Sequence, residues 1–189
     1  MFLDRDGVLI QDVHLLTRCD QVYVCLGAAE AVAMLKQSSF AVVVVTNQPV
    51  IARGMASEAE IERINQHIEH RLRPPEGRAI DRFYYCPHHP NADLPRYRIE
   101  CECRKPRPGM LIAAAEEMDL DLGASYMVGD RPSDIIAGHR VGCATILVET
   151  GMQNAPPIES PDTPAENAEP DFVCADLLEA TKYILESSE

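Results

Sequence analysis

The sequence predicts an α/β fold, a three-layer α/β/α sandwich around a mostly parallel, Rossmann-like sheet. Short runs of β-branched residues alternate with helical patterns along the chain, which is typical of strands joined by helical crossovers. The run FAVVVVT at 40–46 is apolar up to its final threonine, as expected for a strand buried on both faces of a parallel sheet. A chain of 189 residues is about the size of one domain, so we expect a single domain over residues 1–189.

Five other short segments have the composition of strands. Phe2 and Leu3 form the end of a first strand, directly ahead of a charged turn. Residues 151–170 contain five prolines and many acidic residues, which predicts an irregular connection before the last strand. The predicted strands occupy residues 2–3, 40–46, 80–85, 125–128, 145–148 and 172–173.

Helical periodicity fills the intervals between these strands. Ser57 and Glu60 form a capping box, which predicts the start of a helix. In that helix Ile61, Ile64 and Ile68 recur at helical spacing, which indicates core packing and no catalytic role. The predicted helices occupy residues 27–37, 57–72, 110–118, 132–142 and 176–185.

Composition excludes some classes of partner. The net charge of −13 disfavours nucleic-acid binding, which needs a basic surface. No apolar run is long enough to span a bilayer, and no signal peptide opens the sequence. We therefore expect a soluble, cytoplasmic monomer. One segment is basic although the chain as a whole is acidic, and this local positive charge favours a small phosphate substrate. Its basic residues are Arg96, Arg98, Arg104, Lys105 and Arg107.

Polar residues follow three of the predicted strands at the point where each ends. Parallel strands present their carboxyl ends at one edge of the sheet, where ligands of such folds bind. A single pair of acidic residues usually makes a turn or a cap, but three such positions at one edge predict a functional site. The residues are Asp4 and Asp6 after the first strand, Thr46 and Asn47 at the second, and Asp130 and Asp134 after the fourth.

These residue types suit phosphoryl transfer. The carboxylates of Asp4 and Asp130 are hard oxygen ligands for Mg²⁺, and a neutralised site allows Asp4 to attack phosphorus. Asp6 projects from the same turn and could act as general acid and then as general base. Thr46 and Lys105 could bind the phosphoryl oxygens, where charge accumulates in the transition state.

A second metal site is predicted within a loop at residues 86–107. Cys86 and His88 form C-x-H, and Cys101 and Cys103 form C-x-C, with twelve residues between the halves. Three thiolates and one imidazole make a closed tetrahedral set for structural Zn²⁺, although His89 is an alternative ligand. We expect the four other cysteines to be free: Cys19, Cys25, Cys143 and Cys174.

Four segments carry a family resemblance. FLDRDG, VVVTNQ, CRKP and YMVGDRPSD resemble, in order, the four motifs of the haloacid dehalogenase (HAD) superfamily. Over residues 2–150, the segments IARG, YYCPHHP and CECRKP narrow the resemblance to the heptose bisphosphate phosphatases. It implies a capless HAD-like fold with a zinc loop, and a Mg²⁺-dependent phosphatase that forms a phospho-aspartate. The implied reaction removes the 7-phosphate of D-glycero-D-manno-heptose 1,7-bisphosphate, a step of lipopolysaccharide or surface-glycan synthesis.

The resemblance also implies residue roles. Asp4 is the nucleophile and Asp6 the acid/base, while Asp4, Asp130 and the backbone carbonyl of Asp6 bind Mg²⁺. Thr46 and Lys105 hold the phosphoryl group, and His88 rather than His89 completes the zinc set. The residues implied to face the substrate are Asn47, Arg53, Arg104 and Arg131.

Two other functions remain open from the sequence. The first is hydrolysis of histidinol phosphate or another small sugar phosphate. Pro49 and Val50 weaken the heptose interpretation, since they replace an expected serine-glycine pair and Pro49 removes a backbone N–H from a turn that could bind phosphate. The second is a non-catalytic receiver-like or pseudo-phosphatase module. Asp6 argues against that module, because a switch that keeps its acyl phosphate needs no acid/base there.

Overall fold

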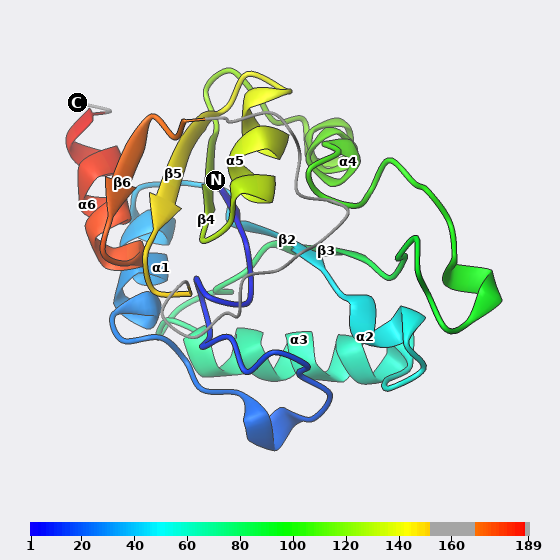
Figure 1. Cartoon of the computed structure of the whole chain (residues 1–189). Coiled ribbons are helices and arrows are strands. Elements are labelled where there is room, and N and C mark those ends of the chain that lie inside the picture. Colours follow the sequence, from blue (N-terminus) through cyan, green and yellow to red (C-terminus); the bar gives the residue numbers. More distant parts are fainter. Residues whose placement is uncertain (152–168, 188–189) are drawn as a thin grey trace.

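A six-stranded parallel sheet forms the centre of the computed structural model, which describes residues 1–151 and 169–187. Its strand order is β3-β2-β1-β4-β5-β6 (Figure 1). Every described pairing is parallel, so the predicted fold class is confirmed. The strands are β1 (Phe2–Leu3), β2 (Val43–Asn47), β3 (Arg82–Cys86), β4 (Tyr126–Gly129), β5 (Ala144–Val148) and β6 (Phe172–Cys174).

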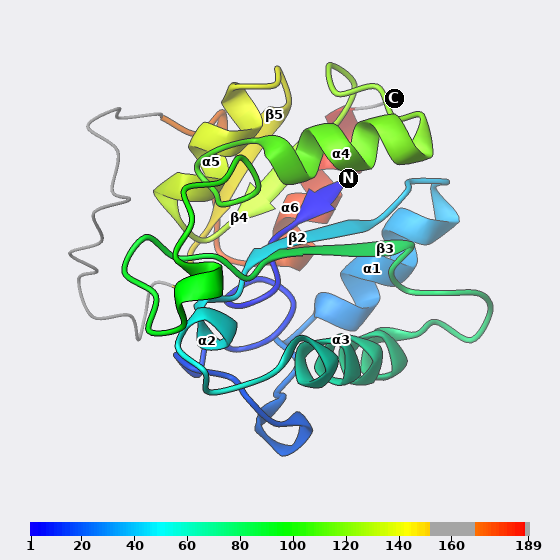
Figure 2. The same cartoon turned by 90° about the vertical axis from the view of Figure 1, so that its right-hand side faces the viewer.

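Helices cover both faces of this sheet (Figure 2). One face carries α4 and α5, and the other carries α1, α3 and α6. The helices are α1 (Ala28–Gln37), α2 (Pro49–Ala52), α3 (Glu58–Leu72), α4 (Gly109–Met118), α5 (Pro132–His139) and α6 (Leu177–Ser187), with short 3₁₀ turns at Cys19–Gln21 and Pro95–Tyr97.

The core is divided between the two faces by the alternation of side chains along the strands. Leu3 and Val44 pack with α1, α3 and α6, whereas Phe2 and Val43 pack with α4 and α5. In β1 the short run Phe2–Leu3 is flanked by β2 and β4 and is fully buried. The charged residues that follow β1 are therefore fixed at the middle of the sheet edge.

Several observed elements differ from the predicted ones in their bounds, and one was not predicted. Strand β2 begins at Val43 instead of residue 40, because pairing starts where Phe2 and Arg82 lie alongside. The short helix α2 was not predicted, and from the sequence Pro49 indicated only the loss of a backbone N–H in this turn. Pro49 instead occupies the first turn of α2, where the N–H has no partner within the helix and its loss costs little.

The last part of the chain follows the prediction as far as it is described. Strand β6 and helix α6 lie where a closing strand and helix were expected. Most of the predicted irregular segment, residues 152–168, lies outside the described residues. Within the described ranges, no helix combines the length and the apolar character needed to cross a membrane.

Candidate active site and metal centre

The predicted site residues meet at the carboxyl edge of the three central strands. Asp4 follows β1, Thr46 lies in β2, and Asp130 follows β4. These strands are neighbours in the sheet, and the backbone N–H of Asp4 donates to the carbonyl of Val128 at 2.9 Å. Because parallel strands end at the same edge of the sheet, side chains up to 126 residues apart in sequence (130 − 4) lie close together there.

A buried lysine lies between two of the carboxylates. Lys105 Nζ is 2.9 Å from Asp4 Oδ1 and 2.6 Å from Asp134 Oδ1, and it donates to the carbonyl of Val45 at 2.7 Å. Burial acts to lower the pKa of Lys105, but Asp134 and Asp4 outweigh it and raise the pKa above its ordinary value. Lys105 therefore stays protonated beside Asp4 and can neutralise charge on a phosphoryl group there.

The third carboxylate has an unfilled acceptor. Asp130 is 1% exposed, and its Oδ1 has no hydrogen-bond partner among residues 1–151 and 169–187. Burial, followed by the charges of Asp4 and Asp134, raises the pKa of Asp130 to about 8. The carboxylates of Asp4, Asp130 and Asp134 offer oxygens within 4.8 Å of one another. A hard divalent cation fits this set, because it would satisfy the unpartnered oxygen and remove the repulsion.

The candidate acid/base has its own set of partners. Asp6 accepts hydrogen bonds from the Arg5 guanidinium, with the shortest N···O distance at 2.9 Å. It also accepts from Gln48 Nε2 at 2.8 Å, and the same nitrogen donates to Thr46 Oγ1 at 2.9 Å. Arg5 is itself fully buried and donates to Asn65 Oδ1 at 3.1 Å. Asp6 is thereby linked to the Thr46 hydroxyl through one amide side chain.

The residues expected to face the substrate have different surroundings. Asn47 exchanges two hydrogen bonds with the main chain of Lys105, both at 3.0 Å. Arg53 is exposed at the end of α2, and Arg104 donates to the carbonyl of His88 at 3.2 Å. Arg131 pairs with Asp12 at 2.7 Å. Substrate contact by these four residues remains a prediction; Asn47 is placed to orient Lys105 as well.

Three cysteines and one histidine form a second group of possible metal ligands. Cys103 Sγ lies 3.1 Å from both Cys86 Sγ and Cys101 Sγ, and 3.4 Å from His88 Nδ1. The Cys86 thiol, as hydrogen-bond partner, is the main cause that lowers the pKa of Cys103 to about 5. His89 lies outside this group, and its Nδ1 accepts from the backbone N–H of Asn91. The donor set suits a closed tetrahedral cation site.

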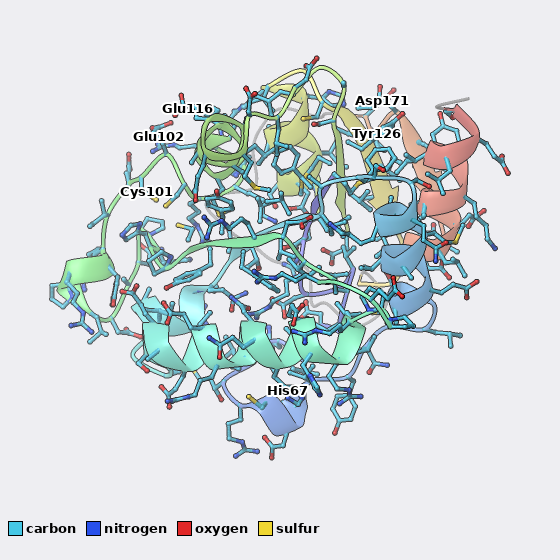
Figure 3. All side chains as sticks on the ribbon, turned by 180° about the vertical axis from the view of Figure 1, so that it is seen from behind. His67, Cys101, Glu102, Glu116, Tyr126 and Asp171 are labelled. Atoms are coloured by element: carbon cyan, nitrogen blue, oxygen red, sulfur yellow. The ribbon has the colours of Figure 1, made fainter. Side chains whose placement is uncertain are left out.

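The loop that carries these ligands also leads into the active site. Cys101 and Glu102 lie in the segment between β3 and α4 (Figure 3). Lys105 follows Cys103 by two residues. A cation held by the four side chains would therefore fix the position from which Lys105 enters the core.

Sequence reasoning gave no role to several residues that the structure brings into the site. Asp134 was noted at the strand end, but its pairing with Lys105 depends on tertiary packing. Gln48 directly follows Thr46 and Asn47, and that adjacency was the available signal. No sequence pattern indicated the other residues that were missed: Arg5, Asp12 and Asn65.

Comparisons with known proteins agree with this geometry. A HAD-hydrolase-like family model matches residues 102–180. The D-glycero-beta-D-manno-heptose-1,7-bisphosphate 7-phosphatase of Escherichia coli K12 is 41% identical over 161 residues, which cover 85% of this chain and 84% of that protein. The corresponding enzyme of Burkholderia mallei, named for the alpha anomer, is 41% identical over 154 residues and 78% of each chain. Sequence identity therefore does not separate the two anomers.

A solved structure extends the similarity to the whole chain. The crystal structure of D,D-heptose 1,7-bisphosphate phosphatase from B. bronchiseptica, complexed with magnesium and phosphate, matches with a TM-score of 0.81. The two chains are 32% identical, and the match covers 99% of this chain and 98% of that one.

Proposed function

We propose that this chain, which belongs to the HAD-like family of D-glycero-D-manno-heptose-1,7-bisphosphate 7-phosphatases, removes the 7-phosphate of that bisphosphate. The observation that carries the proposal is the buried contact of Asp4 with Lys105, beside the unpartnered oxygen of Asp130. This contact supports the roles proposed for Asp4 as nucleophile, for Lys105 as fixed cation and for Asp130 as cation-binding carboxylate. The curated relatives are named phosphatases, which disfavours the receiver-like alternative.

Asp4 would act as the nucleophile. Its Oδ1 is held by Lys105 Nζ and by the backbone N–H of Arg5 at 2.8 Å. Mg²⁺, held by Asp4, Asp130 and the backbone carbonyl of Asp6, would supply positive charge to the substrate phosphate. Asp4 attacks phosphorus, an Asp4–phosphorus bond forms, and the bond to the sugar oxygen breaks.

Asp6 would serve both half-reactions. It first gives its proton to the departing sugar oxygen, then takes a proton from the water that attacks the phospho-aspartate. Release of inorganic phosphate restores Asp4 and leaves Asp6 protonated again. Meanwhile Lys105 and the Thr46 hydroxyl bind the phosphoryl oxygens as their charge develops.

The cysteine-rich loop and the arginines around the site would determine which substrate binds. We propose that Cys86, His88, Cys101 and Cys103 hold structural Zn²⁺, because three thiols and one imidazole suit that ion better than Mg²⁺. Three arginines around the site would contact the sugar and its second phosphate: Arg53, Arg104 and Arg131.

Phosphate release in the presence of Mg²⁺ tests the proposal. The substrates are both anomers of heptose 1,7-bisphosphate and histidinol phosphate, and the Asp4→Asn variant is the control. We expect turnover of a heptose anomer that is lost in the variant. Turnover of histidinol phosphate alone would keep the mechanism and overturn the substrate, whereas no turnover by a folded chain would overturn both.

A further inference from the structure

Gln48 is a buried amide whose polar atoms are all engaged. It is 3% exposed and precedes α2 as its N-cap. Its Nε2 donates to Asp6 Oδ2 at 2.8 Å and to Thr46 Oγ1 at 2.9 Å, while its Oε1 accepts from Arg5 at 2.8 Å. The reversed amide would place Oε1 against a carboxylate, so its partners determine its orientation.

The backbone around Gln48 is fixed as firmly as the side chain. Its N–H donates to the carbonyl of Cys86 at 2.8 Å. Arg5, which approaches the amide from the other side, is fully buried and also donates to Asn65 Oδ1 on α3. Gln48 thus has little freedom to turn away from Asp6.

We propose that Gln48 is a positioning residue that aims the acid/base Asp6 and the phosphoryl ligand Thr46 at the same reacting group. The inference rests on the proposed function, and it deepens that function by adding a residue that touches neither substrate nor metal. Because Gln48 donates to Thr46 Oγ1, the hydroxyl hydrogen of Thr46 is directed elsewhere and can reach a phosphoryl oxygen.

The two half-reactions depend on this arrangement differently. When the Asp4–phosphorus bond forms, an alkoxide leaving group must receive a proton from Asp6 as its bond to phosphorus breaks. A p-nitrophenolate leaving group is stable without that proton. When water then attacks the phospho-aspartate, its proton passes to Asp6 whatever the first leaving group was.

The test compares an alkyl and an aryl ester in the full-length Gln48→Met chain with Mg²⁺ present. Methionine keeps the length of the side chain and removes its hydrogen bonds. We expect kcat/KM for heptose 1,7-bisphosphate to fall about 100-fold, the lower end of what general acid catalysis contributes. The kcat/KM for p-nitrophenyl phosphate should fall much less, because that ester needs no proton from Asp6 and loses only the support that Gln48 gives to Thr46. Hydrolysis of this ester should show a burst of p-nitrophenolate, because breakdown of the phospho-aspartate is slowed.

Gln66→Met is the matched control, since Gln66 is exposed on α3 and should leave both constants unchanged. An equal loss for both esters, or no loss for either, would overturn the inference while the proposed function stands. A wild-type chain inactive toward both esters would overturn the function and the inference with it.

A folding defect would not hide the result. If Gln48→Met does not unfold cooperatively, Asn65→Ala removes an outer acceptor of Arg5 and leaves Gln48 in place. We expect the same difference between the two esters at smaller amplitude. If Asn65→Ala changed kcat/KM by the same factor for both esters, that result would count against the positioning role.

Discussion

Lys105 Nζ lies 2.6 Å from Asp134 Oδ1, with the lysine side chain 2% exposed and the aspartate 1%. Two such groups are stable away from water only as a hydrogen-bonded pair, because each alone would bear a large desolvation penalty. Asp134 also accepts from the backbone N–H of Arg131 at 3.1 Å and so caps α5. One carboxylate therefore stabilises both Lys105 and the helix that follows Asp130.

The Asp134→Asn substitution should destabilise the protein. It removes one of two negative partners of Lys105 and keeps the shape and the helix cap. We expect the free energy of unfolding in urea to fall by about 3 kcal/mol, the lower end for a broken buried pair, since Asp4 remains. Glu116→Gln, on the exposed surface of α4 (Figure 3), is the matched control. A variant as stable as that control would show that the pair contributes little.

Gly151→Ala should weaken Mg²⁺ binding. A Cβ at Gly151 would overlap Asp130 Oδ2, so this carboxylate must move. Overpacking of this kind costs about 1–3 kcal/mol, and we expect the Mg²⁺ concentration for half-maximal activity to rise about tenfold, equivalent to 1.4 kcal/mol. Gly123→Ala serves as control, because its added carbon would meet only Asp121 Oδ1, 3.4 Å away. An unchanged Mg²⁺ requirement would contradict the role given to Asp130.

Much of the site was predictable because it depends on strand ends. Asp4, Thr46 and Asp130 each lie at the end of a short apolar strand, and parallel topology alone makes such ends adjacent. The group of three cysteines and one histidine was predictable because its members form two pairs that are each close in sequence. The first prediction combines a local pattern with one rule about the sheet, and the second needs only the local spacing.

The remaining contacts depend on packing that no local pattern encodes. Asp134 and Lys105 belong to two segments 29 residues apart (134 − 105), and their approach requires α5 and the loop to pack on the same face. Arg5 looks like a solvated charge in sequence, yet it is fully buried. Pro49 was interpreted as a defect, because the sequence did not show that its position begins a helix.

Replacement of a zinc ligand should affect structure and catalysis together. In Cys101→Ser we expect bound zinc, measured by elemental analysis, to fall well below about one ion per chain. The thermal midpoint should fall as well, and kcat should decrease because Lys105 loses its support. Cys19→Ser is the control, since that thiol lies outside the Cys/His group and approaches the carbonyl of Arg63 at 3.9 Å. Full activity in a zinc-free Cys101→Ser chain would limit the ion to stability.

Asn47→Ala tests whether this amide orients Lys105. Its loss leaves the N–H and the carbonyl of Lys105 without the partners that they have at 3.0 Å. Each unsatisfied group costs about 1–3 kcal/mol, so the free energy of unfolding should fall by at least about 2 kcal/mol, with a lower kcat. Asn47→Asp keeps the acceptor for the Lys105 N–H and should lose less stability than alanine. If Asn47 instead acts only through the substrate, alanine would raise KM, leave unfolding unchanged and give no such order between the two variants.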